Sequence, residues 1–126
     1  MALLPRLEKE LAELKAGYTV EVIEEPGQVC VVLKGFGVGP GYNCTATDLL
    51  VRVPRTYPDA PLDMFWVDEA LLLSNGKIPQ AADAIETHIG RRWRRFSWHW
   101  PPPWNPNVGN LSLFIAFVRR RLDEKR

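Results

Sequence analysis

The spacing of hydrophobic residues changes along the chain, and each spacing predicts a different element. Near the N-terminus leucines recur every three or four residues, with Glu and Lys between them, which is typical of an amphipathic helix. Pro5 suits the first turn of this helix, and Gly17 is expected to end it. The leucines concerned are Leu3, Leu4, Leu7, Leu11 and Leu14.

Alternating and β-branched residues follow the helix and predict strands. The segments 18–25 and 28–36 are separated by a Pro-Gly pair at 26–27, so we expect them to form a hairpin. The segment 43–58 predicts a third strand, and the segment 62–67 predicts a fourth. Together these segments predict a four-stranded antiparallel meander.

The last part of the chain predicts a long irregular segment and a second helix. Residues 68–107 show no sustained hydrophobic period and contain several prolines and tryptophans; a loop of this length in a compact domain is usually functional. Helical spacing returns in 110–122, with Asn107 or Asn110 as the N-cap. The whole pattern predicts one α+β domain over 1–126, with both helices on the same face of the sheet.

Length and composition agree with this prediction and exclude several classes of protein. A chain of 126 residues has the size of one domain, and 46% hydrophobic and 25% charged residues are ordinary globular values. Disorder, collagen and coiled coil are therefore poor interpretations. No apolar run approaches the roughly 18 residues of a membrane span, and early charges interrupt the stretch where a secretion signal would be apolar. We expect a cytoplasmic protein without a membrane span.

Charge is distributed unevenly although the net charge is only +1. Residues 1–25 and 26–89 each carry a net charge of −3, whereas residues 90–126 carry +7. The arginines, which lie beside tryptophans, could contact nucleic-acid phosphates while the rings stack on bases. The near-neutral total argues against nucleic acid, and a face for an acidic protein, or a solvated face, explains the same residues. These arginines are Arg91, Arg92, Arg94, Arg95 and Arg119, Arg120, Arg121.

Neither a cofactor nor a metal is expected from the motifs in the chain. The alternate glycines in 35–41 fit neither the dinucleotide-binding nor the Walker spacing, so they favour a glycine-rich hairpin loop over a phosphate site. Cys30 and Cys44 lie in strand-like sequence and are expected to be reduced, packed thiols that transfer chemistry does not need. With His88 and His99 they offer no short metal-ligand spacing.

The order of elements and two short motifs resemble the ubiquitin-conjugating (UBC-like) fold. YPDAP at 57–61 looks like the Tyr-Pro-x-x-Pro-Pro signature between that family's third and fourth strands, and WNP at 104–106 looks like the Trp-x-Pro before its next helix. With the tryptophan-rich segment 90–111, the chain resembles the bacterial branch named family E, whose operons also encode ubiquitin-like proteins. The resemblance implies three partners: an adenylating activating enzyme, a ubiquitin-like protein and a metal-dependent isopeptidase of the same pathway.

The nucleophile of that family is missing from its usual place. Those enzymes transfer an acyl group through a cysteine thioester, and this chain contains no cysteine after position 44. When 74–78 is aligned with the family's Asn-Gly-x-Ile-Cys stretch, Pro79 takes the cysteine position. Counting back from Trp104 instead places that position near Ser97. The family's His-Pro-Asn triplet is also absent, and only Asn75 lies nearby.

Ser97 and His99 are the candidates for chemistry. In an extended segment residues i and i+2 project to the same side, so His99 could take the proton of Ser97, which would accept the acyl group as an oxyester. Asn75 or backbone amides would stabilise the oxyanion. The alternative is a packed aromatic segment in which Ser97 makes a backbone hydrogen bond and His99 stacks or caps, since the sequence shows no third group to orient the histidine.

Two function classes remain open. The first is a transferase that carries the ubiquitin-like protein on a residue other than cysteine, and the second is an adaptor of the same fold that binds the activating enzyme or the ubiquitin-like protein without a nucleophile. For the activating enzyme, the resemblance indicates the N-terminal helix, with Arg6 and Lys9 as candidates. The candidate partner-binding residues within the two motifs are Tyr57, Pro58, Pro61 and Trp104.

Overall fold

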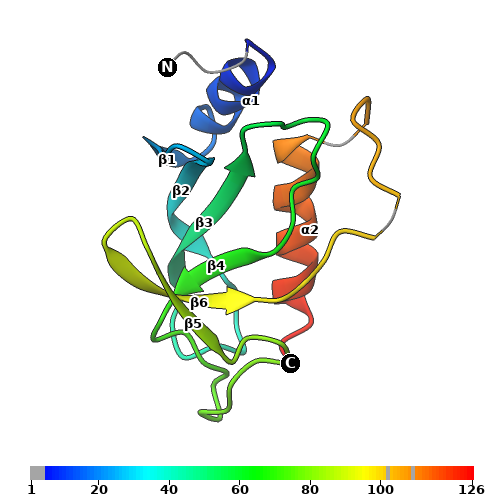
Figure 1. The fold of residues 1–126 in the computed structure, drawn as a ribbon. Coiled ribbons are helices and arrows are strands. Elements are labelled where there is room, and N and C mark those ends of the chain that lie inside the picture. The colour runs from blue at the N-terminus through cyan, green and yellow to red at the C-terminus, as the bar shows by residue number, and fades with distance from the viewer. Residues whose placement is uncertain (1–4, 102, 109) are drawn as a thin grey trace.

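Two helices and one six-stranded antiparallel sheet are formed by the residues that the computed structural model describes, 5–101, 103–108 and 110–126. The helices are α1 (Pro5–Lys15) and α2 (Leu111–Asp123). The strands are β1 (Thr19–Glu24), β2 (Gln28–Gly37), β3 (Ala46–Pro54), β4 (Phe65–Asp68), β5 (Ala84–His88) and β6 (Arg91–Phe96). Their order in the sheet is β1-β2-β3-β4-β6-β5, with α2 lying along one face (Figure 1). The α+β class is as predicted.

The predicted four-stranded meander is wrong in its strand count. The segment 68–107, predicted to be irregular, contains the β5–β6 hairpin, and β6 pairs with β4 so that Phe65 lies opposite Phe96. Four of the six residues of β6 are arginines, and a charged residue ordinarily indicates an exposed position. Here Arg94 is buried beside Trp93, so the polar pattern conceals a central strand.

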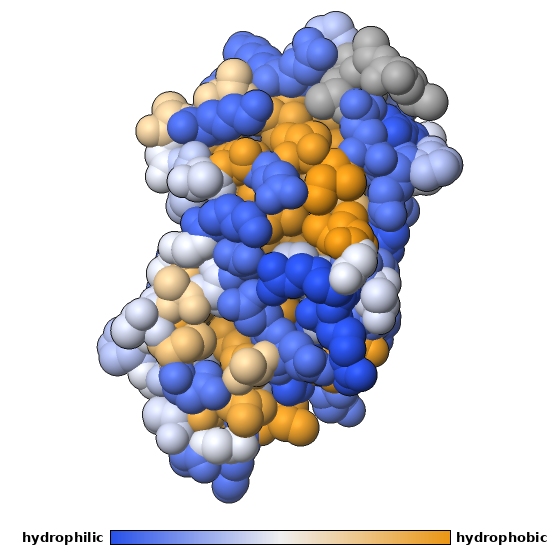
Figure 2. Space-filling model, turned by 90° about the vertical axis from the view of Figure 1, so that its left-hand side faces the viewer, coloured by the Kyte–Doolittle hydropathy of each residue, from blue (hydrophilic) through white to orange (hydrophobic). Residues whose placement is uncertain are grey.

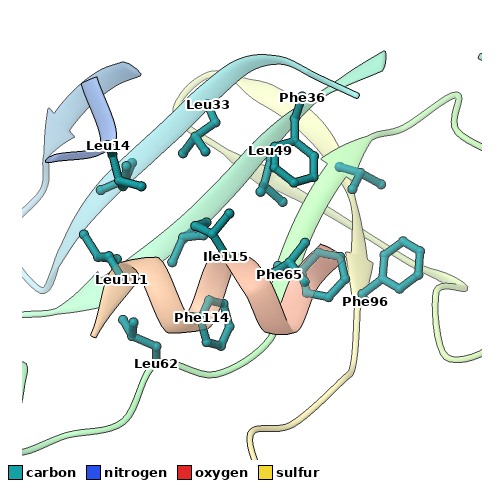
Figure 3. Close-up of a cluster of buried hydrophobic side chains, with 14 of the residues drawn as sticks. Leu14, Leu33, Phe36, Leu49, Leu62, Phe65, Phe96, Leu111, Phe114 and Ile115 are labelled. Atoms are coloured by element: carbon teal, nitrogen blue, oxygen red, sulfur yellow. The ribbon is translucent and has the colours of Figure 1, made fainter. Parts of the chain in front are cut away.

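The main core lies between the helices and one face of the sheet, as predicted. α1 contributes three leucines to it, and α2 contributes Leu111, Phe114, Ile115, Val118 and Leu122. In the close-up of Figure 3, Phe114 and Ile115 lie among the side chains of the sheet and Leu62. Asn110 caps α2, because its side-chain oxygen accepts a hydrogen bond from the Leu113 amide at 2.9 Å. Of the two predicted caps, Asn110 is therefore the one used.

A second, smaller cluster covers the opposite face of the sheet. It consists of Cys30, Val32, Leu50, Trp66 and Trp93. Arginine side chains lie over its two tryptophans: the guanidinium carbon of Arg91 is 3.9 Å from the ring centre of Trp93, and that of Arg52 is 5.8 Å from Trp66. Burial on both faces explains why residues 29–33 are continuously hydrophobic instead of alternating.

Hydrophobic side chains also reach the surface on the side that carries β1 and the β5–β6 hairpin. Figure 2 views this side and shows them gathered in its upper half, with hydrophilic residues around them. Neither helix within the described ranges has the length and hydropathy needed to cross a bilayer.

Candidate functional site

The two motifs quoted for the resemblance meet in space. Trp104 donates a hydrogen bond from Nε1 to the carbonyl of Pro58 at 2.7 Å, and the ring centres of Tyr57 and Trp104 are 6.4 Å apart. The YPDAP motif forms the turn between β3 and β4, and it holds the segment that precedes α2. Tyr57 is buried, whereas Pro61 at the end of the motif is exposed. Of the candidate partner-binding residues, Tyr57 thus has a packing role, and Pro61 lies on the surface.

Glu10 of α1 connects this turn to both helices. Its Oε1 accepts hydrogen bonds from the hydroxyl of Tyr57 at 2.6 Å and from the amide of Leu111 at 2.7 Å. Burial, followed by the hydrogen bond to Glu10, raises the pKa of Tyr57. The carboxylate also lies at the positive end of the α2 dipole. Sequence reasoning missed Glu10, although its position three residues after Leu7 places it on the leucine face of the helix.

Arg6 belongs to the same arrangement. Its Nε donates to Glu10 Oε2 at 3.0 Å, its guanidinium lies 5.6 Å from the ring centre of Tyr57, and it also contacts the carbonyl of Pro106. Lys9, by contrast, is exposed on α1. Of the two residues predicted to bind the activating enzyme, Lys9 is therefore the one that substitution can probe without changing these internal contacts.

The two positions deduced for the missing cysteine lie in one region of the fold. The amide of Ser97 donates to the carbonyl of Ala81 at 2.8 Å, and Nη1 of Arg94 donates to the carbonyl of Ala82 at 2.7 Å. The segment that begins at the buried Pro79 therefore lies against the end of β6. Pro79, which the alignment reaches, is thus two residues from Ala81, the hydrogen-bond partner of Ser97, which the count reaches.

The side chains of Ser97 and His99 have separate partners. Nε of Arg95 donates to Ser97 Oγ at 3.1 Å, whereas Nδ1 of His99 lies 2.8 and 3.0 Å from the two carboxylate oxygens of Asp63. No hydrogen bond joins Ser97 to His99, because residues 97–100 are not a regular strand and Asp63 holds the imidazole. Asp63 is the orienting group that sequence reasoning did not find.

Asn75 is held by its own turn. Its Oδ1 accepts a hydrogen bond from the amide of Lys77 at 2.9 Å, and the residue is exposed. No hydrogen bond connects it to Ser97. Its predicted role at an oxyanion stays a prediction.

Cys30 has the environment of a packed thiol, whereas Cys44 is half-buried and lies just before β3, not within a strand as predicted. Cys30 is fully buried in the second cluster and donates from Sγ to Glu25 Oε1 at 3.2 Å; burial, with this hydrogen bond, raises its pKa to about 11. Burial, with the charge of Asp68, also raises the pKa of Cys44. A thiol with a raised pKa stays protonated at neutral pH and is a poor nucleophile. In the described part of the chain, no three Cys, His, Asp or Glu residues are grouped as metal ligands would be.

The arginines of β6 are paired within the protein. Arg91 contacts Asp48 at 2.9 Å and Asp68 at 2.6 Å, Arg92 contacts Glu69 at 2.7 Å, and Arg95 contacts Glu86 at 2.5 Å. Although burial opposes ionisation of Asp48, hydrogen bonds from Arg91 and its neighbours lower the pKa of this carboxyl. Pairing of this kind leaves these guanidinium groups little freedom to contact nucleic-acid phosphates.

Comparison with family models identifies one family. The model described as Prokaryotic E2 family E matches residues 4–125, which is nearly the whole chain. The chain therefore belongs to this family. Comparisons with curated proteins and with solved structures gave no match.

Proposed function

We propose that this member of the prokaryotic E2 family E has a UBC-like fold and carries a ubiquitin-like protein as an ester on Ser97, in a pathway with an activating enzyme. The observation that carries the proposal is the hydrogen bond from the Ser97 amide to Ala81, two residues from Pro79, together with the raised pKa of both thiols. Ser97 supplies the hydroxyl in that region. Family membership supports the ubiquitin-like protein and the activating enzyme as the general kind of partner.

The proposed loading step is an acyl transfer to oxygen. Oγ of Ser97 attacks the carbonyl carbon of the activated C-terminus, the bond to the leaving group breaks, and the hydroxyl proton passes to a base. Oγ accepts its hydrogen bond from Arg95, so its own proton is available for that base. His99 is the base proposed from the sequence, and Asn75 or backbone amides are proposed for the oxyanion.

The second candidate is an adaptor without a nucleophile, and one observation favours it. Ser97 has no hydrogen bond to His99, and its amide and hydroxyl are both bonded to neighbouring groups. Such an adaptor would hold the activating enzyme or the ubiquitin-like protein in place. Under either proposal the protein works in the cytoplasm, and a metal-dependent isopeptidase of the same pathway would reverse the modification.

Incubation with the cognate activating enzyme, ATP and the ubiquitin-like protein separates the two candidates. We expect an adduct on this chain that mild alkali and hydroxylamine remove and that Ser97→Ala abolishes. Ser112→Ala is the matched control, because Ser112 is exposed on α2. An adduct that persists in Ser97→Ala would refute Ser97 as the acceptor. A stable complex without any adduct would establish the adaptor.

A further inference from the structure

Two histidines of the chain contact a carboxylate, and they differ in what surrounds them. His88 contacts Glu86 through Nε2 at 2.9 Å, but Glu86 also accepts from Trp66 and from Arg95, so this pair is part of a packed network. His99 contacts Asp63 through Nδ1, and Asp63 makes no other hydrogen bond with the described residues. The His99–Asp63 pair is therefore not part of a larger hydrogen-bond network among the described residues.

The carboxylate of Asp63 selects one tautomer of the neutral His99 imidazole. A carboxylate can only accept, so in the neutral imidazole Nδ1 carries the proton and the lone pair lies on Nε2. Nε2 has no hydrogen-bond partner within the described residues, and the side chain is 64% exposed. This is the arrangement in which a histidine serves as a base.

The imidazole borders a hollow with aromatic walls. The hollow has a volume of about 330 Å³ and is lined by Pro61, Leu62, Asp63, His99, Trp100 and Trp104; we call it the Trp hollow. Trp104 is anchored by its hydrogen bond to Pro58, and the ring of Trp100 lies 5.4 Å from Trp104 and 5.4 Å from Phe117. The walls are therefore held in place before any ligand arrives.

A second hollow adjoins the first at Asp63. It has a volume of about 390 Å³, lies over the second cluster beside Trp66, and is lined by Arg95, whose Nε donates to Ser97. Pro61 and Asp63 line both hollows. Asp63 thus lines both the Trp hollow, beside His99, and the hollow that contains Arg95, the hydrogen-bond partner of Ser97.

We propose that His99 is a general base for the acceptor amine and that Asp63 is its positioning residue, with the Trp hollow receiving the acceptor side chain. This proposal rests on the proposed function, because the ester on Ser97 is the bond under attack. The amine nitrogen attacks the ester carbonyl carbon while Nε2 takes a proton from that nitrogen. The C–O bond then breaks, and the serine oxygen leaves with the electron pair and receives the proton from Nε2. An amide and a free serine result.

A simple ester tests the base on the purified protein, without the other pathway components. Hydrolysis of p-nitrophenyl acetate uses water as the nucleophile, Nε2 takes its proton, and p-nitrophenolate leaves. We expect His99→Gln to lower the protein-catalysed rate by about tenfold or more. Asp63→Asn should lower it several-fold, Asp63→Glu should restore most of it, and His88→Gln should leave it unchanged. Equal rates for wild type and His99→Gln would overturn the proposal.

The tautomer of His99 supplies a readout that a merely structural pair would not give. Long-range proton–nitrogen NMR should show the proton on Nδ1 in the wild type and a mixture of both tautomers in Asp63→Ala. A wild type with the proton on Nε2 would also overturn the proposal.

The adduct assay with the activating enzyme tests the proposed function separately from the role of His99. If no adduct forms, the proposed function fails, and the ester assay still decides whether His99 is a base. With an adduct, its discharge by free lysine should slow in His99→Gln and not in His88→Gln.

Discussion

At the scale of single residues, Glu10 is the side chain that connects both helices to the turn at Tyr57. One carboxylate accepts hydrogen bonds from α1, from the Tyr57 turn and from the first residue of α2. A buried carboxylate is costly unless its oxygens are satisfied, and these three donors satisfy them. Without Glu10 the Tyr57 hydroxyl and the Leu111 amide would lose this acceptor.

Glu10→Ala is expected to lower the free energy of unfolding by about 2–3 kcal/mol, because it leaves the Tyr57 hydroxyl and the Leu111 amide buried without an acceptor. Urea unfolding followed by circular dichroism measures this change. Glu13→Ala is the matched control, since Glu13 is exposed on the same helix and should change stability by less than about 0.5 kcal/mol. Equal effects of the two substitutions would contradict the assignment.

Cys30 gives a prediction about pH. Its folded pKa, about 11, lies above the ordinary value of 9.0, so the unfolded thiol loses its proton first as pH rises. The stability that this difference contributes is fully present below pH 9 and declines between pH 9 and 11. Cys30→Ala should lower stability at pH 7 by about 1–2 kcal/mol and flatten the decline above pH 9. An identical pH profile for the two proteins would exclude Cys30 as its source.

Substitution of either cysteine also tests which residue accepts the ubiquitin-like protein. Neither Cys30→Ala nor Cys44→Ala is expected to abolish an adduct with the ubiquitin-like protein, because burial keeps both thiols protonated. The gel assay described for Ser97 measures this. Loss of the adduct in a folded Cys44→Ala protein would make Cys44 the acceptor instead.

At the scale of elements, the β5–β6 hairpin extends the sheet and depends on an arginine inside it. Arg94 of β6 donates to the carbonyl of Glu69 at 3.2 and 3.0 Å and to that of Ala82 at 2.7 Å. These carbonyls belong to the connection between β4 and β5. Arg94 thus holds the β4–β5 connection against β6, the strand that the sequence pattern did not predict.

Arg94→Ala should destabilise the protein by about 2–3 kcal/mol, since the buried carbonyl of Ala82 and the half-buried carbonyl of Glu69 lose their donor. Arg92→Ala is the control from the same strand, because Arg92 is exposed and its ion pair with Glu69 is expected to contribute about 0.5 kcal/mol. Thermal unfolding of both variants compares the two effects. A larger loss in Arg92→Ala than in Arg94→Ala would be inconsistent with the buried role of Arg94.

The elements that could be predicted are those in which local sequence and burial agree. The leucine spacing of α1 and the alternation of β1 arise because one face is buried and the other is solvated. β6 escaped prediction because Arg94 is buried against carbonyls that are distant in sequence. Of the candidate site, residue types could be proposed, but the Asp63–His99 contact joins residues 36 positions apart, and no local pattern encodes it.

At the scale of the whole molecule, part of the uneven charge of the sequence is paired in the fold. Arginines of β6 contact acidic residues from the segment 26–89, which carries a net negative charge. The concentration of charge near the C-terminus therefore does not produce a uniformly basic face. Paired arginines are less available to the phosphates of a nucleic acid than the sequence alone suggests.

The protein is expected not to bind single-stranded DNA at physiological salt at concentrations up to about 10⁻⁴ M, because its β6 arginines are already paired. Fluorescence anisotropy of a labelled oligonucleotide measures this. Tight binding that weakens steeply with salt would contradict the prediction and favour a nucleic-acid partner.

The activating enzyme is expected to contact α1, so Lys9→Glu should weaken that complex severalfold without changing stability. Lys15→Glu, at the exposed last residue of the same helix, tests whether the effect is local. Calorimetry with the purified enzyme gives both affinities. Unchanged affinity in Lys9→Glu would remove this surface from consideration.

The bond between Glu10 and the Leu111 amide also has a consequence for synthesis on the ribosome. Its two ends are 101 residues apart, so α1 leaves the ribosome long before its acceptor has a donor from α2. At about 5–20 residues per second, this interval is on the order of 5–20 s. During that time Glu10 lacks its bond to the Leu111 amide, and the core lacks the hydrophobic side chains that α2 supplies.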